Sequence, residues 1–251
     1  MRWCLFCNRR ATSKEHVWPL WLLERLRRAP MATIHSERGD GTRNRWSGKE
    51  VTAKFVCAGC NNGWMSELEN VVKPVVEPLL LDHNVGLDRP AQTVLAAWAV
   101  KNAMVFEALR VAPPWFFTDG ERSAFRKSLR PPTRTNVWIA KCVEHSGCFC
   151  SAFDMNVVLD EGETTVPAHL TTMAFGSLTI QIAAGKLPHS VPLATTVTLE
   201  DTSTRWEEAT VRIWPGPLEL VNWPRPVHLR GNQGLEALEN RWGPHPENDD
   251  G

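Results

Sequence analysis

Two Cys-x-x-Cys pairs in the first 60 residues constrain this chain most. The first pair is Cys4 and Cys7, and the second is Cys57 and Cys60. Each pair offers two thiolates from one tight turn, and four thiolates are a ligand set that tetrahedral zinc favours. The long stretch between the pairs has room for a strand, a loop and a second strand. We therefore expect a structural zinc to join the two ends of a small unit.

Redox chemistry is the weaker interpretation of these cysteines. A single Cys-x-x-Cys motif would suffice for it, and no thioredoxin-like βαβ pattern surrounds either pair.

Residues with carboxylate, amide and imidazole side chains lie close to the cysteines in the sequence. Glu15 and His16 follow the first pair, and Asn61 and Asn62 come directly after the second. Carboxylate and amide oxygens suit Mg²⁺ or Mn²⁺ and leave coordination positions for water and phosphate. A Glu-His dipeptide alone is typical of a surface, and asparagines at the start of a helix are favoured N-caps. The hypothesis of a second metal site therefore depends on where these residues stand relative to the cysteines.

The motifs Cys4-x-x-Cys7, Glu15-His16-x-x-Pro19 and Cys57-x-x-Cys60-Asn61-Asn62 together resemble those of the zinc-containing HNH/ββα-metal endonucleases. Within that family the chain is similar to the Asn-ended variants, and the resemblance covers about the first 75 residues. It implies that His16 activates water as a general base. It also implies that Glu15 and Asn61 hold a catalytic Mg²⁺ or Mn²⁺, with Asn62 as a further candidate ligand, while the four cysteines bind structural zinc.

The chain departs from the family pattern at three places. Most members have Asp where Glu15 stands, and many have a histidine where Asn61 stands. The middle asparagine that orients the histidine loop has Asn44 as its only candidate match. Glu67 and Glu69 could add a carboxylate to the site, although solvated positions on a helix are the more common explanation.

Charge divides the chain unevenly, although its formal net charge is zero. Residues 1–64 hold 12 Lys/Arg against 5 Asp/Glu, a net charge of +7, and the remainder carries −7. A basic segment with the candidate site suits a polyanionic substrate, although an ordinary solvated basic surface has the same composition. The resemblance to the HNH endonucleases implies that this substrate is double-stranded or branched DNA. The candidate nucleic-acid contacts are Arg9, Arg10, Lys14, Arg25, Arg28, Arg43, Arg45, Trp46 and Lys49.

Hydrophobic periodicity predicts the elements of the first part of the chain. We expect strands at residues 12–17 and 51–56, a helix at 20–28, a long loop or loose hairpin at 35–50, and a helix after Cys60. Pro74, Pro78 and residues 82–90 predict a boundary.

The rest of the chain predicts helices and a run of short strands. We expect an apolar core helix over 91–111 and further helices near 120–129 and 234–241. The predicted strands are 137–143, 149–156, 171–183, 194–199, 210–214 and 218–222, with a hairpin turn at 144–147.

These patterns predict an α+β protein of two units. An HNH-like module at residues 1–80 would precede an α+β unit at residues 90–251, with a mostly antiparallel sheet and a long core helix. The second unit could recognise substrate or form a homodimer.

Three further cysteines lie in the second unit. Cys142, Cys148 and Cys150, with His145 between them, could form a second metal cluster. Their placement on strands either side of a turn favours buried thiols instead.

No apolar run has the length of a membrane span, and the start of the chain lacks the apolar region of a signal peptide. We therefore expect a cytoplasmic protein with reduced thiols. The expected function is metal-dependent hydrolysis of nucleic-acid phosphodiester bonds, with DNA preferred over RNA. The alternatives are a non-catalytic zinc-containing nucleic-acid-binding module and a zinc-containing protein-interaction adaptor.

Overall fold

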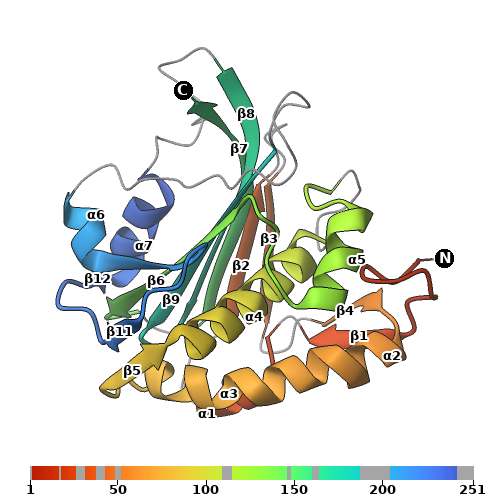
Figure 1. Cartoon of the computed structure of the whole chain (residues 1–251), viewed down its shortest axis with the longest axis horizontal. Coiled ribbons are helices and arrows are strands. Elements are labelled where there is room, and N and C mark those ends of the chain that lie inside the picture. The colour runs from red at the N-terminus through yellow and green to blue at the C-terminus, as the bar shows by residue number, and fades with distance from the viewer. Residues whose placement is uncertain are drawn as a thin grey trace.

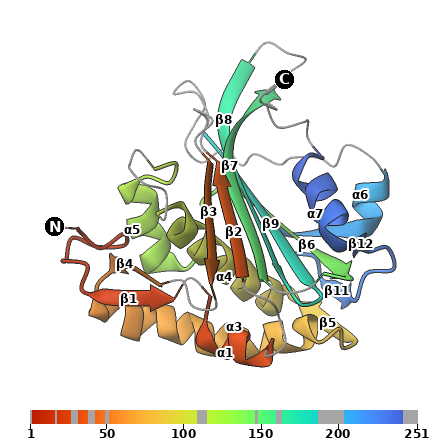
Figure 2. The same ribbon diagram turned by 180° about the vertical axis from the view of Figure 1, so that it is seen from behind.

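In the computed structural model, helix α4 (Arg89–Glu107) packs against one face of a large β-sheet (Figures 1 and 2). The structure describes residues 2–16, 18–26, 32–37, 43–48, 52–108, 115–145, 148–159, 164–186 and 204–241. Asp88 caps α4 by accepting a hydrogen bond from the backbone N–H of Ala91. Leu95, Trp98 and Met104 are fully buried on it. The prediction of an apolar core helix is therefore confirmed.

The large sheet has eight strands in the order β10-β6-β9-β8-β7-β2-β3, with β12 beside β6. Neighbouring strands are antiparallel except for the β2–β7 and β12–β6 pairs, which are parallel. The mixed α+β class and the mostly antiparallel sheet agree with the sequence analysis. The strands are β2 (Ala32–Glu37), β3 (Arg43–Gly48), β6 (Thr135–Val143), β7 (Cys148–Leu159), β8 (Thr164–Phe175), β9 (Leu178–Gly185), β10 (Thr210–Trp214) and β12 (Leu229–Arg230).

Strands β2 and β3 connect the N-terminal segment with the large sheet. They form the hairpin left open for residues 35–50, with Ala32 opposite Gly48 and Glu37 opposite Arg43. Strand β2 then pairs with β7, so the insert between the two cysteine pairs extends a sheet built mainly from the second half of the chain. Side chains from both halves also share one hydrophobic core. The division at residues 80–90 stays a prediction.

A second, two-stranded sheet lies beside the helices that follow the cysteines (Figure 1). Strand β1 (Ser13–His16) pairs antiparallel with β4 (Thr52–Val56). After β4 the chain becomes helical at once, through α2 (Ala58–Cys60), the π-helical turn η1 (Asn61–Met65) and α3 (Ser66–Leu80).

Helix α3 continues through Pro74 and Pro78. A proline inside a helix removes one backbone hydrogen bond. The helix persists because Leu68, Val72 and Val76 form a buried stripe on one of its faces. Residues 82–90 also hold structure, since β5 (Val85–Asp88) pairs with β11 (Leu220–Trp223) far along the chain.

Two turn predictions in the second half are wrong. Residues 171–183 are two strands, because β8 and β9 turn at Gly176, whose φ is +52°. A Cβ at Gly176 would lie 2.8 Å from the carbonyl oxygen of Leu80, so a side chain has no room there. The turn at 144–147 is no hairpin, because β9 and β8 lie between β6 and β7 in the sheet.

Three of the remaining helices follow the predictions with shifted ends, namely α1 (Leu20–Arg25), α5 (Asp119–Ser128) and α7 (Gly231–Glu239). Helix α6 (Thr204–Ala209) was not predicted. Residues 194–199 lie outside the described residues. Within the described part of the chain, no helix combines the length and the hydropathy that a bilayer crossing requires.

Candidate metal centre and adjoining pocket

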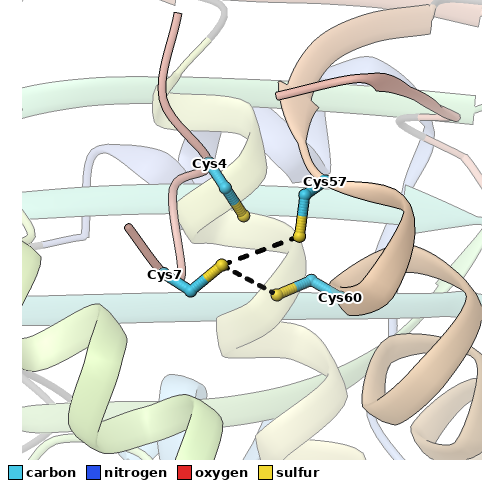
Figure 3. A group of neighbouring side chains, drawn as sticks. All are labelled: Cys4, Cys7, Cys57 and Cys60. Carbon is cyan, nitrogen blue, oxygen red and sulfur yellow. Dashed lines mark hydrogen bonds between the residues drawn. The ribbon is translucent and has the colours of Figure 1, made fainter. Parts of the chain in front are cut away.

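The four predicted zinc cysteines come together in space (Figure 3). The Sγ atoms of Cys4, Cys7, Cys57 and Cys60 all lie within 4.8 Å of one another. The Sγ of Cys7 is 3.6 Å from that of Cys57 and 3.7 Å from that of Cys60. A tetrahedral zinc with Zn–S bonds of about 2.3 Å would separate its sulfurs by about 3.8 Å. These cysteines are therefore close enough to bind a metal ion, and their spacing is consistent with structural zinc.

Two short backbone turns present the thiols. In the first, Cys7 N–H donates to the Cys4 carbonyl and Cys4 N–H donates to the Arg9 carbonyl. In the second, Cys57 is the extended N-cap of α2, and Cys60 N–H donates to its carbonyl. The N–H of Leu5 donates to the carbonyl of Phe55 in β4, which joins the two turns.

Burial changes the acidity of the thiols. It raises the pKa of Cys4 and that of Cys60. Burial also opposes ionisation of Cys57, but hydrogen bonds from the Cys60 backbone and from the neighbouring thiols outweigh it and lower the Cys57 pKa to about 7. Of Cys4, Cys57 and Cys60, Cys57 therefore supplies a thiolate to an arriving metal ion most readily.

The predicted catalytic residues line one pocket of about 250 Å³. Glu15 and His16 reach it from β1, and Asn61 and Asn62 reach it from η1. The pairing of β1 with β4 brings the two segments together, because β4 leads directly into Cys57 and the helix. The other lining residues are Pro19, Leu20, Trp21, Ser66 and Glu69.

Asn61 is held by hydrogen bonds to β1. Its Nδ2 donates to Ser13 Oγ at 2.7 Å and to the Lys14 carbonyl at 3.4 Å. A carbonyl can only accept, so the amide nitrogen faces β1 and Oδ1 is left as the atom that could bind a cation. The alternative role of Asn61 and Asn62 as helix caps is wrong, since Cys57 is the N-cap and the asparagines lie inside the helical segment.

Glu15 is buried, with 6% of its surface exposed, and its partner is Lys101 of α4. The Lys101 Nζ lies 3.4 Å from Glu15 Oε1 and 2.9 Å from Glu69 Oε1. Burial raises the pKa of Glu15 above its usual value, although the positive charge of Lys101 opposes this shift. Lys101 was not predicted as part of the site, and a solvated position was expected for Glu69. A lysine inside a largely apolar helix could have indicated this ion pair, because a buried lysine needs an acidic partner.

The candidate nucleic-acid contacts divide into two groups. Arg9, Arg10 and Lys14 are exposed near the cysteines, whereas Arg25 forms an ion pair with Glu77 of α3, with 2.9 Å between Nε and Oε1. The other candidate contacts lie outside the described residues or on strands whose side chains are not described: Arg28, Arg43, Arg45, Trp46 and Lys49. Asn44, the candidate for orienting the histidine loop, is also on such a strand.

The three other cysteines are buried thiols. Cys142, Cys148 and Cys150 are at most 4% exposed, and burial raises the pKa of each. Among the described residues, no further group of three or more His, Cys, Asp or Glu side chains is close enough to share a metal ion, so these three thiols form no second cluster.

A larger cavity of about 790 Å³ borders Cys4 and Cys7 on the side of α5. Trp3, Phe55 and Trp115 line it, whereas Glu15, His16 and Asn61 do not. The predicted catalytic residues therefore line the smaller of the two pockets.

Comparisons of the chain with protein-family models, with curated proteins and with solved structures found no match. The geometry of the cysteines and the pocket is thus the basis for a functional proposal.

Proposed function

We propose that the chain is a metal-dependent endonuclease that hydrolyses phosphodiester bonds of nucleic acid, with DNA as its main substrate. One observation carries the proposal. Glu15, His16, Asn61 and Asn62, from two segments far apart in the sequence, line the same pocket next to a cluster of four cysteines. These are the residues for which the HNH-like motifs imply catalytic roles.

Each of these side chains suits one requirement of phosphodiester hydrolysis. His16 lies at the end of β1 and is only partly buried, so its imidazole can take a proton from an attacking water molecule. Glu15 and Asn61 offer a carboxylate and an amide oxygen, which fit Mg²⁺ or Mn²⁺. Such a cation, when bound, neutralises charge on the scissile phosphate.

The four cysteines have a structural role in this proposal. They join the turn before β1 to the start of the helical segment, and these two elements carry the pocket residues. A zinc ion there would fix the separation of His16 and Asn61. Arg9, Arg10 and Lys14 are exposed and could contact the substrate backbone.

One observation favours the alternative of a non-catalytic nucleic-acid-binding module. The carboxylate of Glu15 already has an internal cationic partner in Lys101, so its charge is compensated without a metal ion. In that alternative Glu15 and His16 stabilise the fold, and the exposed basic residues bind nucleic acid without cutting it.

Cleavage by the purified full-length chain distinguishes the two functions. Supercoiled, linear and branched DNA and RNA are incubated with Mg²⁺ or Mn²⁺, and product is measured by gel electrophoresis. We expect cleavage that requires the divalent cation and is reduced roughly 10²–10⁴-fold in His16→Ala, because the general base is lost. His83→Ala is the matched control, since His83 is exposed after α3 and does not line the pocket.

A His16→Ala protein that cleaves as well as the parent would contradict the catalytic proposal. Binding that weakens with salt, without any cleavage, would establish the binding-module alternative instead.

A further inference from the structure

Lys101 is a fully buried lysine in the middle of α4, with 1% of its surface exposed. Its ammonium lies between two carboxylates from different elements, Glu15 of β1 and Glu69 of α3. Charged lysines are almost never buried unless they are paired. Burial by itself lowers the pKa of Lys101, but the two glutamates outweigh it and raise the pKa above its usual value. The distances from Nζ to both carboxylates are those of a buried ammonium paired with two acidic side chains.

Both glutamates are pocket residues, whereas the lysine is not. Glu15 and Glu69 line the cavity that His16 and Asn61 share, and Lys101 does not line it. The ammonium contacts both carboxylates from a side chain outside the pocket lining. A single ammonium leaves the two carboxylates with a net charge of −1, so the pair can still attract a divalent cation.

We propose that Lys101 is a positioning residue that holds Glu69 beside Glu15, and that Glu69 is thereby a further ligand of the cation in this pocket. This inference rests on the proposed function, which supplies the cation. It adds a carboxylate from α3 to a site otherwise made of β1 and η1. The lysine carries two of its three N–H groups to these oxygens and fixes their separation before a cation arrives.

A purely structural role for Lys101 leads to a different expectation. If the lysine only compensated buried charge, its removal would leave two uncompensated carboxylates at the pocket. A divalent cation would then bind more tightly, because a like charge has gone. If Lys101 positions the carboxylates, its removal weakens cation binding even though the local charge becomes more negative. The sign of the change in affinity therefore separates the two roles.

The test measures Mn²⁺ binding to the zinc-loaded full-length protein by electron paramagnetic resonance, without nucleic acid. Glu69→Gln is expected to weaken Mn²⁺ binding roughly 10–100-fold, and Lys101→Met about tenfold or more. Glu67→Gln is the matched control, since Glu67 is exposed on the same helix and does not line the pocket. Lys101→Arg keeps the charge and is expected to retain more affinity than Lys101→Met.

Two results would overturn the proposal. One is a Glu69→Gln protein that binds Mn²⁺ as tightly as Glu67→Gln. The other is a Lys101→Met protein that binds Mn²⁺ as well as or better than the parent. If Lys101→Met fails to fold, the comparison of Glu69→Gln with Glu67→Gln still decides the question.

The same assay separates failure of this inference from failure of the proposed function. Mn²⁺ binding that depends on Glu69, without any nuclease activity, would support Glu69 as a ligand and contradict the proposed endonuclease function. Cleavage by the parent that Glu69→Gln leaves unchanged, with unchanged Mn²⁺ binding, supports the endonuclease and rejects the assignment.

Discussion

The side-chain amide of Asn61 donates a hydrogen bond to the hydroxyl of Ser13, with 2.7 Å between Nδ2 and Oγ. This contact joins the π-helical turn after the last cysteine to the strand that carries Glu15 and His16. It also fixes the amide orientation, so the Ser13 hydroxyl positions a candidate cation ligand without lining the pocket itself.

We expect Ser13→Ala to weaken the cation dependence of cleavage more than it weakens the fold. Loss of the hydrogen bond should lower the free energy of unfolding by about 0.5–1.5 kcal/mol. The Mg²⁺ concentration for half-maximal cleavage should rise roughly tenfold or more, because partners that orient a ligand affect metal affinity at that scale. Ser128→Ala is the control, since the Ser128 hydroxyl donates to a helix carbonyl away from the pocket. Equal Mg²⁺ dependence in the two variants would argue against a positioning role for Ser13.

Zinc content should depend on the N-terminal cysteines alone. We expect one zinc per chain by elemental analysis, and we expect Cys57→Ala to lose it together with the native near-ultraviolet circular dichroism of the N-terminal segment. The physical reason is that the four thiolates join two segments that are otherwise distant in sequence. Cys148→Ala removes a buried thiol outside the cluster and should retain zinc. A native-like, zinc-free preparation of the parent would refute the site.

A buried ion pair should contribute strongly to stability. Arg122 Nη2 lies 2.6 Å from Glu107 Oε2, and both side chains are fully buried between α4 and α5. Arg122→Met leaves the Glu107 carboxylate without its cation and should lower the free energy of unfolding by about 3–5 kcal/mol. Arg126→Met, on the exposed face of the same helix, should change it by less than about 0.5 kcal/mol. Urea denaturation measures both, and a loss of less than about 1 kcal/mol in Arg122→Met would contradict the prediction.

Stability should fall as the pH rises from about 4.5 to about 8, in part because of Glu239 on α7. Burial raises the pKa of Glu239 from 4.5 to about 8, and the nearby charge of Glu236 adds to the shift. The folded state then holds a proton that the unfolded state releases over this range, so ionisation of Glu239 favours unfolding as the pH increases.

Glu239→Gln should remove this contribution. The variant should gain stability relative to the parent between pH 5 and pH 8, measured by denaturation at a series of pH values. Ser151 donates its hydroxyl hydrogen to Glu239, and the glutamine oxygen can still accept it. Glu219→Gln, at an exposed site, is the control. A parallel pH dependence in the parent and Glu239→Gln would contradict the assignment.

Local sequence patterns were sufficient to predict the features that depend on residues close together in the chain. The spacing of Cys4, Cys7, Cys57 and Cys60 predicted the cluster because each pair folds on its own short turn. The apolar content of residues 91–111 predicted the core helix α4 for a similar reason. Helix α3 runs through Pro74 and Pro78 while it buries Leu68, Val72 and Val76, and such burial depends on elements that are distant in the sequence.

Two cysteine pairs, an acidic residue beside a histidine and two asparagines can be recognised as candidates for metal chemistry from their order along the chain. Which further charges accompany them depends on how distant helices and strands pack together. The Lys101 side chain reaches Glu15 and Glu69 because α4 packs beside α3 and near the end of β1 that carries Glu15, and no local pattern encodes that packing. Likewise, β2 joins β7 through backbone hydrogen bonds, which are the same for every residue type and leave little trace in the sequence.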